Sequence, residues 1–101
     1  MKDNSLTDLN DSDQNTLRLL ECVFPKGLQE AEYLPLLHIL GKEMTIRAAA
    51  SFVGTLVGKY YMDVYHDAMV AKGDSYHPDL NIVENLKERL KECGYEAWLE
   101  G

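Results

Sequence analysis

Three residues in the second half of the chain have side chains and a spacing that could hold a metal ion. Asp63, His66 and Asp67 stand at positions i, i+3 and i+4, which lie on one side of an α-helix. A carboxylate and an imidazole so spaced supply half of a di-metal site in helical bundles. A closed site needs about four ligands, and no second motif accompanies the first. We therefore interpret the three residues as a polar helix face and predict no metal and no cofactor site.

His38 is the other residue that could do chemistry. It lies in an otherwise apolar segment, and a histidine in such a place could act as a general base. A catalytic base needs a nucleophile or a substrate pocket within hydrogen-bond reach, and the sequence indicates neither. A glycine-rich phosphate loop, a Cys-x-x-Cys pair and a Gly-x-Ser-x-Gly elbow are missing as well. The sequence thus predicts no catalytic residue and gives no support for enzyme catalysis.

The two cysteines, Cys22 and Cys93, lie near opposite ends of the sequence and are not accompanied by other metal-ligand spacings. Small secreted domains usually carry more cysteines, and no charged-then-apolar leader precedes the polar start of the chain. Free cysteine is among the most buried residue types. We expect two reduced thiols, each buried on a helix, in a cytoplasmic protein.

The charge of the chain is −7, from 17 acidic and 10 basic residues. Proteins that bind nucleic acids gain much of their affinity from lysine and arginine side chains that neutralise phosphates. The acidic balance therefore disfavours nucleic acid as a partner. Residues 1–11 are polar and rich in aspartate, and they cannot bury enough apolar surface to fold, so we predict a disordered acidic tail followed by a helical domain over residues 12–101.

Apolar residues recur at helical spacing in five segments, and no segment shows the alternation typical of a strand. Proline or glycine punctuates these segments. The pattern predicts an all-α fold, a single compact bundle of about five helices. The expected helices span residues 14–24, 31–41, 45–58, 60–72 and 79–93.

The segment 45–58 is the predicted centre of this bundle. No charged residue lies between Arg47 and Lys59, and the segment is too short to span a bilayer, which needs about 20 apolar residues. We expect it to be a buried central helix that begins after Thr45 as N-cap. Near the end of the chain, Tyr95 and Trp98 are large and apolar, so we expect this last segment to fold back on the bundle.

Several short motifs resemble a known family of small bacterial proteins that is abundant in mycobacteria, domain-of-unknown-function family 3349. They are Phe24-Pro25-Lys26-Gly27, Tyr33-Leu34-Pro35-Leu36-Leu37 and, at the end of the last helix, Arg89-Leu90 followed by Gly94-Tyr95. The chain departs from the family at Tyr95, where members usually have tryptophan, and before the fourth helix, where members have a proline. The resemblance implies an all-helical bundle and brings no established activity, so it transfers no catalytic residues.

Two non-enzymatic functions fit the pattern of the fourth predicted helix. One helix cannot bury all its large side chains on a single side, and exposed Tyr and Met are enriched at protein interfaces. The first hypothesis is therefore that the protein is a protein-interaction or self-associating module. It predicts that the protein binds a protein partner or forms a homo-oligomer. Its candidate surface consists of Tyr60, Tyr61, Met62, Tyr65 and Met69.

The alternative hypothesis is a helix-turn-helix-like DNA-binding protein. Ala50 and Gly54 are four residues apart and a second helix follows a short turn, as in helix-turn-helix cores. The would-be recognition helix carries Asp63 and Asp67 in its interior, whose charges would repel phosphates. We expect the interaction module rather than the DNA-binding protein, with no membrane and no small molecule as a partner.

Overall fold

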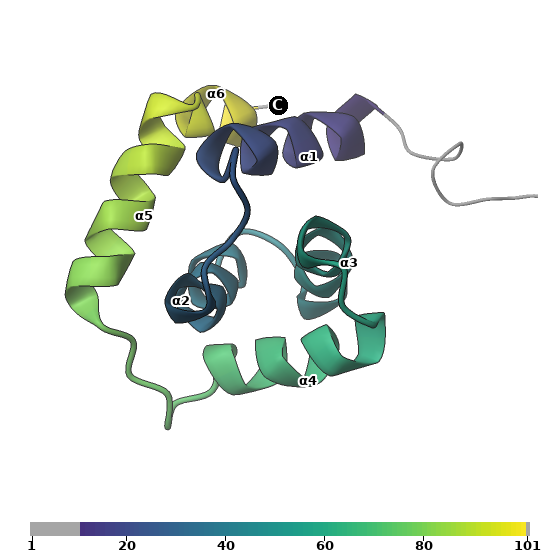
Figure 1. Ribbon diagram of the computed structural model, residues 1–101, viewed down its shortest axis with the longest axis vertical. Helices are drawn as coiled ribbons and strands as arrows, with labels where there is room; N and C mark the ends of the chain where they lie inside the picture. The colour runs from purple at the N-terminus through teal and green to yellow at the C-terminus, as the bar shows by residue number, and fades with distance from the viewer. Residues whose placement is uncertain (1–10, 101) are drawn as a thin grey trace, which may run out of the picture.

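The computed structural model describes residues 11–100 of the chain, which form α-helices joined by turns and short loops (Figure 1). The all-α prediction is confirmed. Residues 1–10 of the predicted tail lie outside the described residues, and residue 11 is already the first of α1. The helices are α1 (Asp11–Val23), α2 (Glu30–Leu40), α3 (Ile46–Val57), α4 (Tyr61–Lys72), α5 (Leu80–Glu92) and α6 (Tyr95–Glu100).

Capping residues explain where several helices begin and end. The Thr45 hydroxyl accepts a hydrogen bond from the Ala48 N–H at 3.0 Å, so Thr45 is the N-cap of α3 as predicted. Asp79 caps α5 in the same way, through the Asn81 N–H at 2.8 Å. Gly58 ends α3 with φ +74°, a left-handed conformation that glycine adopts without steric cost. The predicted helix boundaries therefore agree with the structure to within a few residues.

The helix at the centre of the molecule is α2 rather than α3. Figure 1 shows α2 nearly end-on in the middle of the view, and α3, α4 and α5 contact it. Its buried residues form a broad apolar face: Pro35, Leu36, Leu37, Ile39 and Leu40. By contrast, α3 exposes Arg47, Ser51 and Thr55 to solvent. The prediction of a central helix at 45–58 is therefore wrong, because small uncharged residues such as serine and threonine can face water without a charge among them.

The last segment forms a sixth short helix, α6, that packs against α1. The Trp98 Nε1–H donates a hydrogen bond to the Thr16 hydroxyl at 2.8 Å, and the Trp98 ring stacks on Tyr95 with 5.4 Å between ring centroids. The expected return of this segment to the bundle is confirmed. Among the described residues, no helix is long and apolar enough to cross a membrane.

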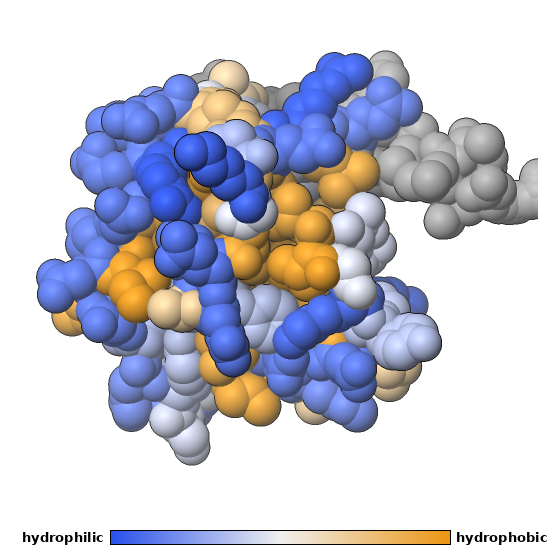
Figure 2. Space-filling model, in the orientation of Figure 1, coloured by the Kyte–Doolittle hydropathy of each residue, from blue (hydrophilic) through white to orange (hydrophobic). Residues whose placement is uncertain are grey.

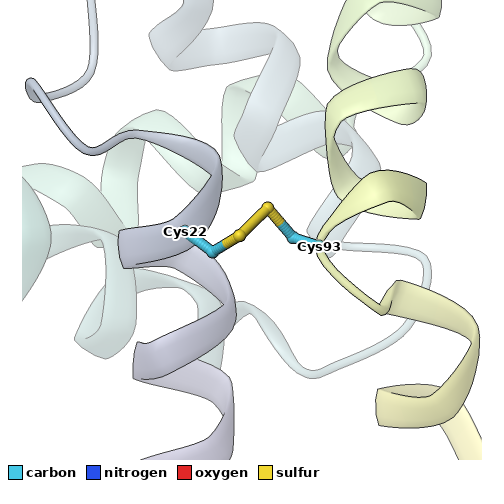
Figure 3. Close-up of a disulfide and its surroundings, with 2 residues drawn as sticks. All are labelled: Cys22 and Cys93. Atoms are coloured by element: carbon cyan, nitrogen blue, oxygen red, sulfur yellow. A yellow bond between two sulfur atoms is a disulfide. The ribbon is translucent and has the colours of Figure 1, made fainter.

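The two cysteines are joined in a disulfide bond, which corrects the prediction of two reduced, buried thiols (Figure 3). Cys22 lies in the last turn of α1 and is exposed, and Cys93 follows α5 and is partly exposed. Folding brings their Cα atoms to 5.9 Å although they are 71 residues apart in sequence. The sequence does not predict this bond, because the distance between the two cysteines depends on how α1 and α5 pack.

Candidate interaction surface

Helix α4 lies at the edge of the molecule and presents large apolar side chains to solvent. In Figure 2, hydrophobic side chains (orange) reach the surface at the lower edge, where α4 runs in Figure 1. The exposed fractions are 84% for Tyr60, 54% for Met62, 49% for Met69 and 56% for Val70. Tyr61 is also exposed, and Tyr65 is partly buried. The candidate residues thus reach the surface, as expected.

The inner face of α4 explains why these side chains remain outside. Val64, Ala68 and Ala71 are buried and pack against the rest of the bundle. Tyr65 is partly buried against the same core, and the other large apolar side chains of α4 reach solvent.

Four residues form a continuous line on the outer face of α4, which we call the α4 stripe: Met62, Tyr65, His66 and Met69. They occupy positions i, i+3, i+4 and i+7, the spacing by which one helix packs against another. The aromatic rings of the stripe lie close together, with 6.5 Å between the centroids of Tyr65 and His66. Tyr61 extends the line, its ring centroid 5.8 Å from that of Tyr65.

The three candidate metal ligands do not assemble into a metal site. Asp63 and His66 are exposed and line a shallow hollow of about 530 Å³ together with Lys59, Tyr60 and Asp67. The Asp67 carboxylate instead accepts a hydrogen bond from the Tyr33 hydroxyl at 2.7 Å. Within residues 11–100, no group of three His, Cys, Asp or Glu side chains could hold a metal ion.

The contact between Tyr33 and Asp67 joins α2 to α4. Burial raises the pKa of Tyr33 well above its usual range, and the hydrogen bond and charge of Asp67, with the charge of Asp63, add to the shift. The Lys59 ammonium lies over the Tyr33 ring, 4.2 Å from its centroid. This cluster therefore holds α4 against α2 rather than forming a reactive site.

His38 has a structural role in this fold. Its Nδ1–H donates a hydrogen bond to the Ala71 carbonyl oxygen at 2.9 Å, which ties α2 to the last turn of α4. A carbonyl oxygen can only accept, so this contact fixes the tautomer with the proton on Nδ1. The ring also packs edge-on against Tyr76, with 5.9 Å between ring centroids.

Helices α3 and α4 pack closely across the turn at residues 58–60. A Cβ atom at Gly54 would lie 3.3 Å from the Lys59 carbonyl oxygen, so glycine permits this approach. The exposed part of α4 carries Asp63 and His66, and its basic residues are confined to Lys59 and Lys72 near its two ends. Two helices joined by a short turn are thus present, but the exposed face of the second helix carries acidic rather than basic residues in its interior, which does not favour phosphate contacts.

We compared the chain with models of protein families, with curated proteins and with solved structures, and none of them matches it. The residues themselves therefore carry the functional argument.

Sequence reasoning missed part of the exposed apolar surface. Val70 lies one residue beyond Met69 and is exposed, and Leu80 and Leu99 are exposed on other helices. For Val70 a signal was present: it follows His66 by four residues on the outer face of α4. Leu80 and Leu99 gave no such signal, because each stands alone at the first or last turn of its helix.

Proposed function

We propose that this protein is a non-enzymatic interaction module that self-associates through the α4 stripe. The observation that carries the proposal is the helical spacing of solvent-exposed apolar side chains on α4. Apolar surface that stays in water is a free-energy cost that a partner helix would relieve, by about 25 cal/mol for each Å² removed from water.

The residue pattern of α4 favours a second copy as the occupant. Met62 and Met69 stand at equal distances from the point between Tyr65 and His66. In an antiparallel helix pair with a two-fold axis at this point, Met62 of each copy lies opposite Met69 of the other.

Local charge does not oppose such a pair. Residues 59–72 carry two lysines and two aspartates, so this part of the surface is formally neutral although the whole chain is at −7. Repulsion between the two molecules therefore comes from more distant charges, which salt screens over about 8 Å at physiological ionic strength. Salt should strengthen the association slightly.

The contact is small. A stable interface usually buries about 800 Å² on each partner and uses 20–30 residues, more than one helix of this length offers. We therefore expect a reversible dimer with a dissociation constant on the order of micromolar.

Sedimentation velocity over a concentration series tests the proposal. The wild type should shift from monomer to dimer as concentration rises, and Met62→Ser with Met69→Ser should weaken the dimer at least tenfold, because truncated apolar anchors at interfaces each cost about 1 to 3 kcal/mol. Leu80→Ser is the control, since it removes an apolar side chain that is even more exposed than Met62 and Met69 but lies outside α4. A wild-type protein that stays monomeric up to millimolar concentration would overturn self-association.

A salt series with duplex DNA separates this proposal from the helix-turn-helix alternative. DNA binding at physiological salt that falls steeply as salt rises, and that weakens in Lys59→Ala and Lys72→Ala, would favour the alternative. We expect no such binding.

Kinship with family 3349 and a cytoplasmic location remain our hypotheses. The motifs around Pro25 and Pro35 support the first. The disulfide bond weighs against the second, because the cytoplasm of most cells keeps thiols reduced. Counting free thiols in protein isolated under alkylating conditions would decide the redox state in the cell.

A further inference from the structure

A groove between α2, α5 and α6 lies apart from the α4 stripe. Its volume is about 310 Å³, at the lower limit of small-molecule sites. The groove is lined by aliphatic side chains of two helices, Ile39 of α2 and Val83 of α5, which are 5% and 6% exposed. Tyr95 of α6 is a further, partly buried lining residue.

Three lysines also line this groove. Lys42 follows α2, and Lys87 and Lys91 lie one turn apart on α5. All three are exposed, and within the described part of the chain no carboxylate forms an ion pair with any of them. The chain has only 10 basic residues against 17 acidic ones, so three lysines around one groove form a local concentration of positive charge.

Two acidic residues, Glu43 and Glu96, also line the groove. Glu43 is next to the Tyr95 hydroxyl: burial raises the pKa of Tyr95 to about 12, and the charge and hydrogen bond of Glu43 contribute to the shift. The Tyr95 hydroxyl therefore adds no negative charge to the lining at neutral pH. The lining keeps an excess of one positive charge.

We propose that this groove binds a monocarboxylic acid with a medium-length aliphatic chain. The aliphatic chain would lie on Ile39 and Val83, and the carboxylate would meet the ammonium groups of Lys42, Lys87 and Lys91. An apolar lining beside cations is complementary to a ligand with one apolar and one anionic end. A phosphate or a nucleic acid would leave the apolar lining uncovered. The inference is independent of self-association through α4.

Octanoate is the probe that tests this inference, by titration against ¹⁵N-labelled protein in nuclear magnetic resonance spectra. A ligand of about ten non-hydrogen atoms has a dissociation constant on the order of 0.1 to 1 mM when each atom contributes an ordinary binding free energy. We expect saturable amide shifts around Ile39 and Val83 in this range. Acetate has the charge without the chain and octylammonium has the chain with the opposite charge, so both should bind at least tenfold more weakly.

Charge variants connect the binding to the lysines. Lys87→Glu with Lys91→Glu should weaken octanoate binding at least tenfold, while Lys87→Arg with Lys91→Arg should retain it. Lys26→Glu is the matched control, an exposed lysine in the loop between α1 and α2 that does not line the groove. Three results would each overturn the proposal: octylammonium binds as tightly as octanoate, the double glutamate variant still binds octanoate, or the wild type does not bind octanoate up to about 5 mM. This limit is roughly five times the weakest dissociation constant expected.

Discussion

At the scale of single residues, the burial of Tyr33 and Tyr95 makes the stability of the fold fall at alkaline pH, and the contact of Tyr33 with Asp67 adds to the effect. Folding raises the pKa of Tyr33, and that of Tyr95 rises to about 12, so the folded state favours the protonated phenols over the ionised ones. The stabilisation is complete below the unfolded value of about 10 and is lost as pH rises through the folded pKa values. The free energy of unfolding should therefore begin to fall above pH 10.

Replacing Tyr33 by phenylalanine tests this dependence. Tyr33→Phe removes the hydrogen bond to Asp67 and should lower the free energy of unfolding at pH 7 by about 1 kcal/mol. Between pH 10 and 12 the variant should lose stability less steeply than the wild type. Urea unfolding at several pH values measures both effects. Tyr60→Phe is the control at an exposed tyrosine and should change neither the stability at pH 7 nor its pH dependence. If Tyr33→Phe and the wild type lost stability equally steeply above pH 10, the raised pKa of Tyr33 would not be the cause.

Residue roles were the hardest part to predict from sequence. That Asp63, His66 and Asp67 share a helix follows from spacing, but the partner of Asp67 is Tyr33, 34 positions earlier in the chain. His38 finds its acceptor, the Ala71 carbonyl, 33 residues away. Such partners depend on which helix faces which, and helical periodicity carries no information about that choice.

At the scale of helices, periodicity and punctuation were sufficient to predict five helices, and among the described residues they missed the short helix α6. Prolines and glycines such as Pro25, Gly41 and Gly58 separate the segments, and each predicted helix is present. The choice of the central helix failed, because the absence of charge in α3 did not show that one face of this helix, with Ser51 and Thr55, is neutral and exposed. The continuous apolar run in α2 was the better signal.

Val53 of α3 still belongs to the core. It is fully buried, so Val53→Asp should place an uncompensated charge among apolar neighbours and lower the free energy of unfolding by several kcal/mol, comparable with the stability of a domain of this size. Circular dichroism during thermal unfolding measures the loss. Ser51→Asp puts the same charge on the exposed face of the same helix and should change stability little. If Val53→Asp melted like the wild type, α3 would not contribute to the core.

At the scale of the whole molecule, the disulfide bond constrains nearly the entire fold. It closes a loop over a sequence separation of 71 residues. Loop-closure entropy for this length corresponds to about 4 kcal/mol of stabilisation, which acts by restricting the unfolded chain. Cys22→Ser should therefore lower the midpoint of urea unfolding markedly. Dithiothreitol should reproduce the effect in the wild type and add nothing in Cys22→Ser; equal midpoints for oxidised and reduced wild type would contradict this expectation.

Two large-scale features could not be predicted because each depends on tertiary packing. The disulfide needs the end of α1 beside the end of α5, and the groove with three lysines needs α2 beside α5. Lys87 and Lys91 could be placed together on α5 from spacing alone, whereas Lys42 could not be added to them. The α4 stripe, by contrast, needs only one helix, and the sequence predicts three of its four residues, Met62, Tyr65 and Met69. His66 was assigned to the polar face of the helix instead.

The disulfide also determines how the folded chain would respond to mechanical force. In the oxidised protein, a pull on the two ends of the chain is transmitted through α1, the bond between Cys22 and Cys93, and α6 (Figure 3). Helices α2, α3, α4 and α5 lie inside the covalent loop and bear no tension along the chain. The loop, with its core, can therefore be extended only after the bond is reduced, while the hydrogen bond between Trp98 of α6 and Thr16 of α1 joins the two helices that carry the load.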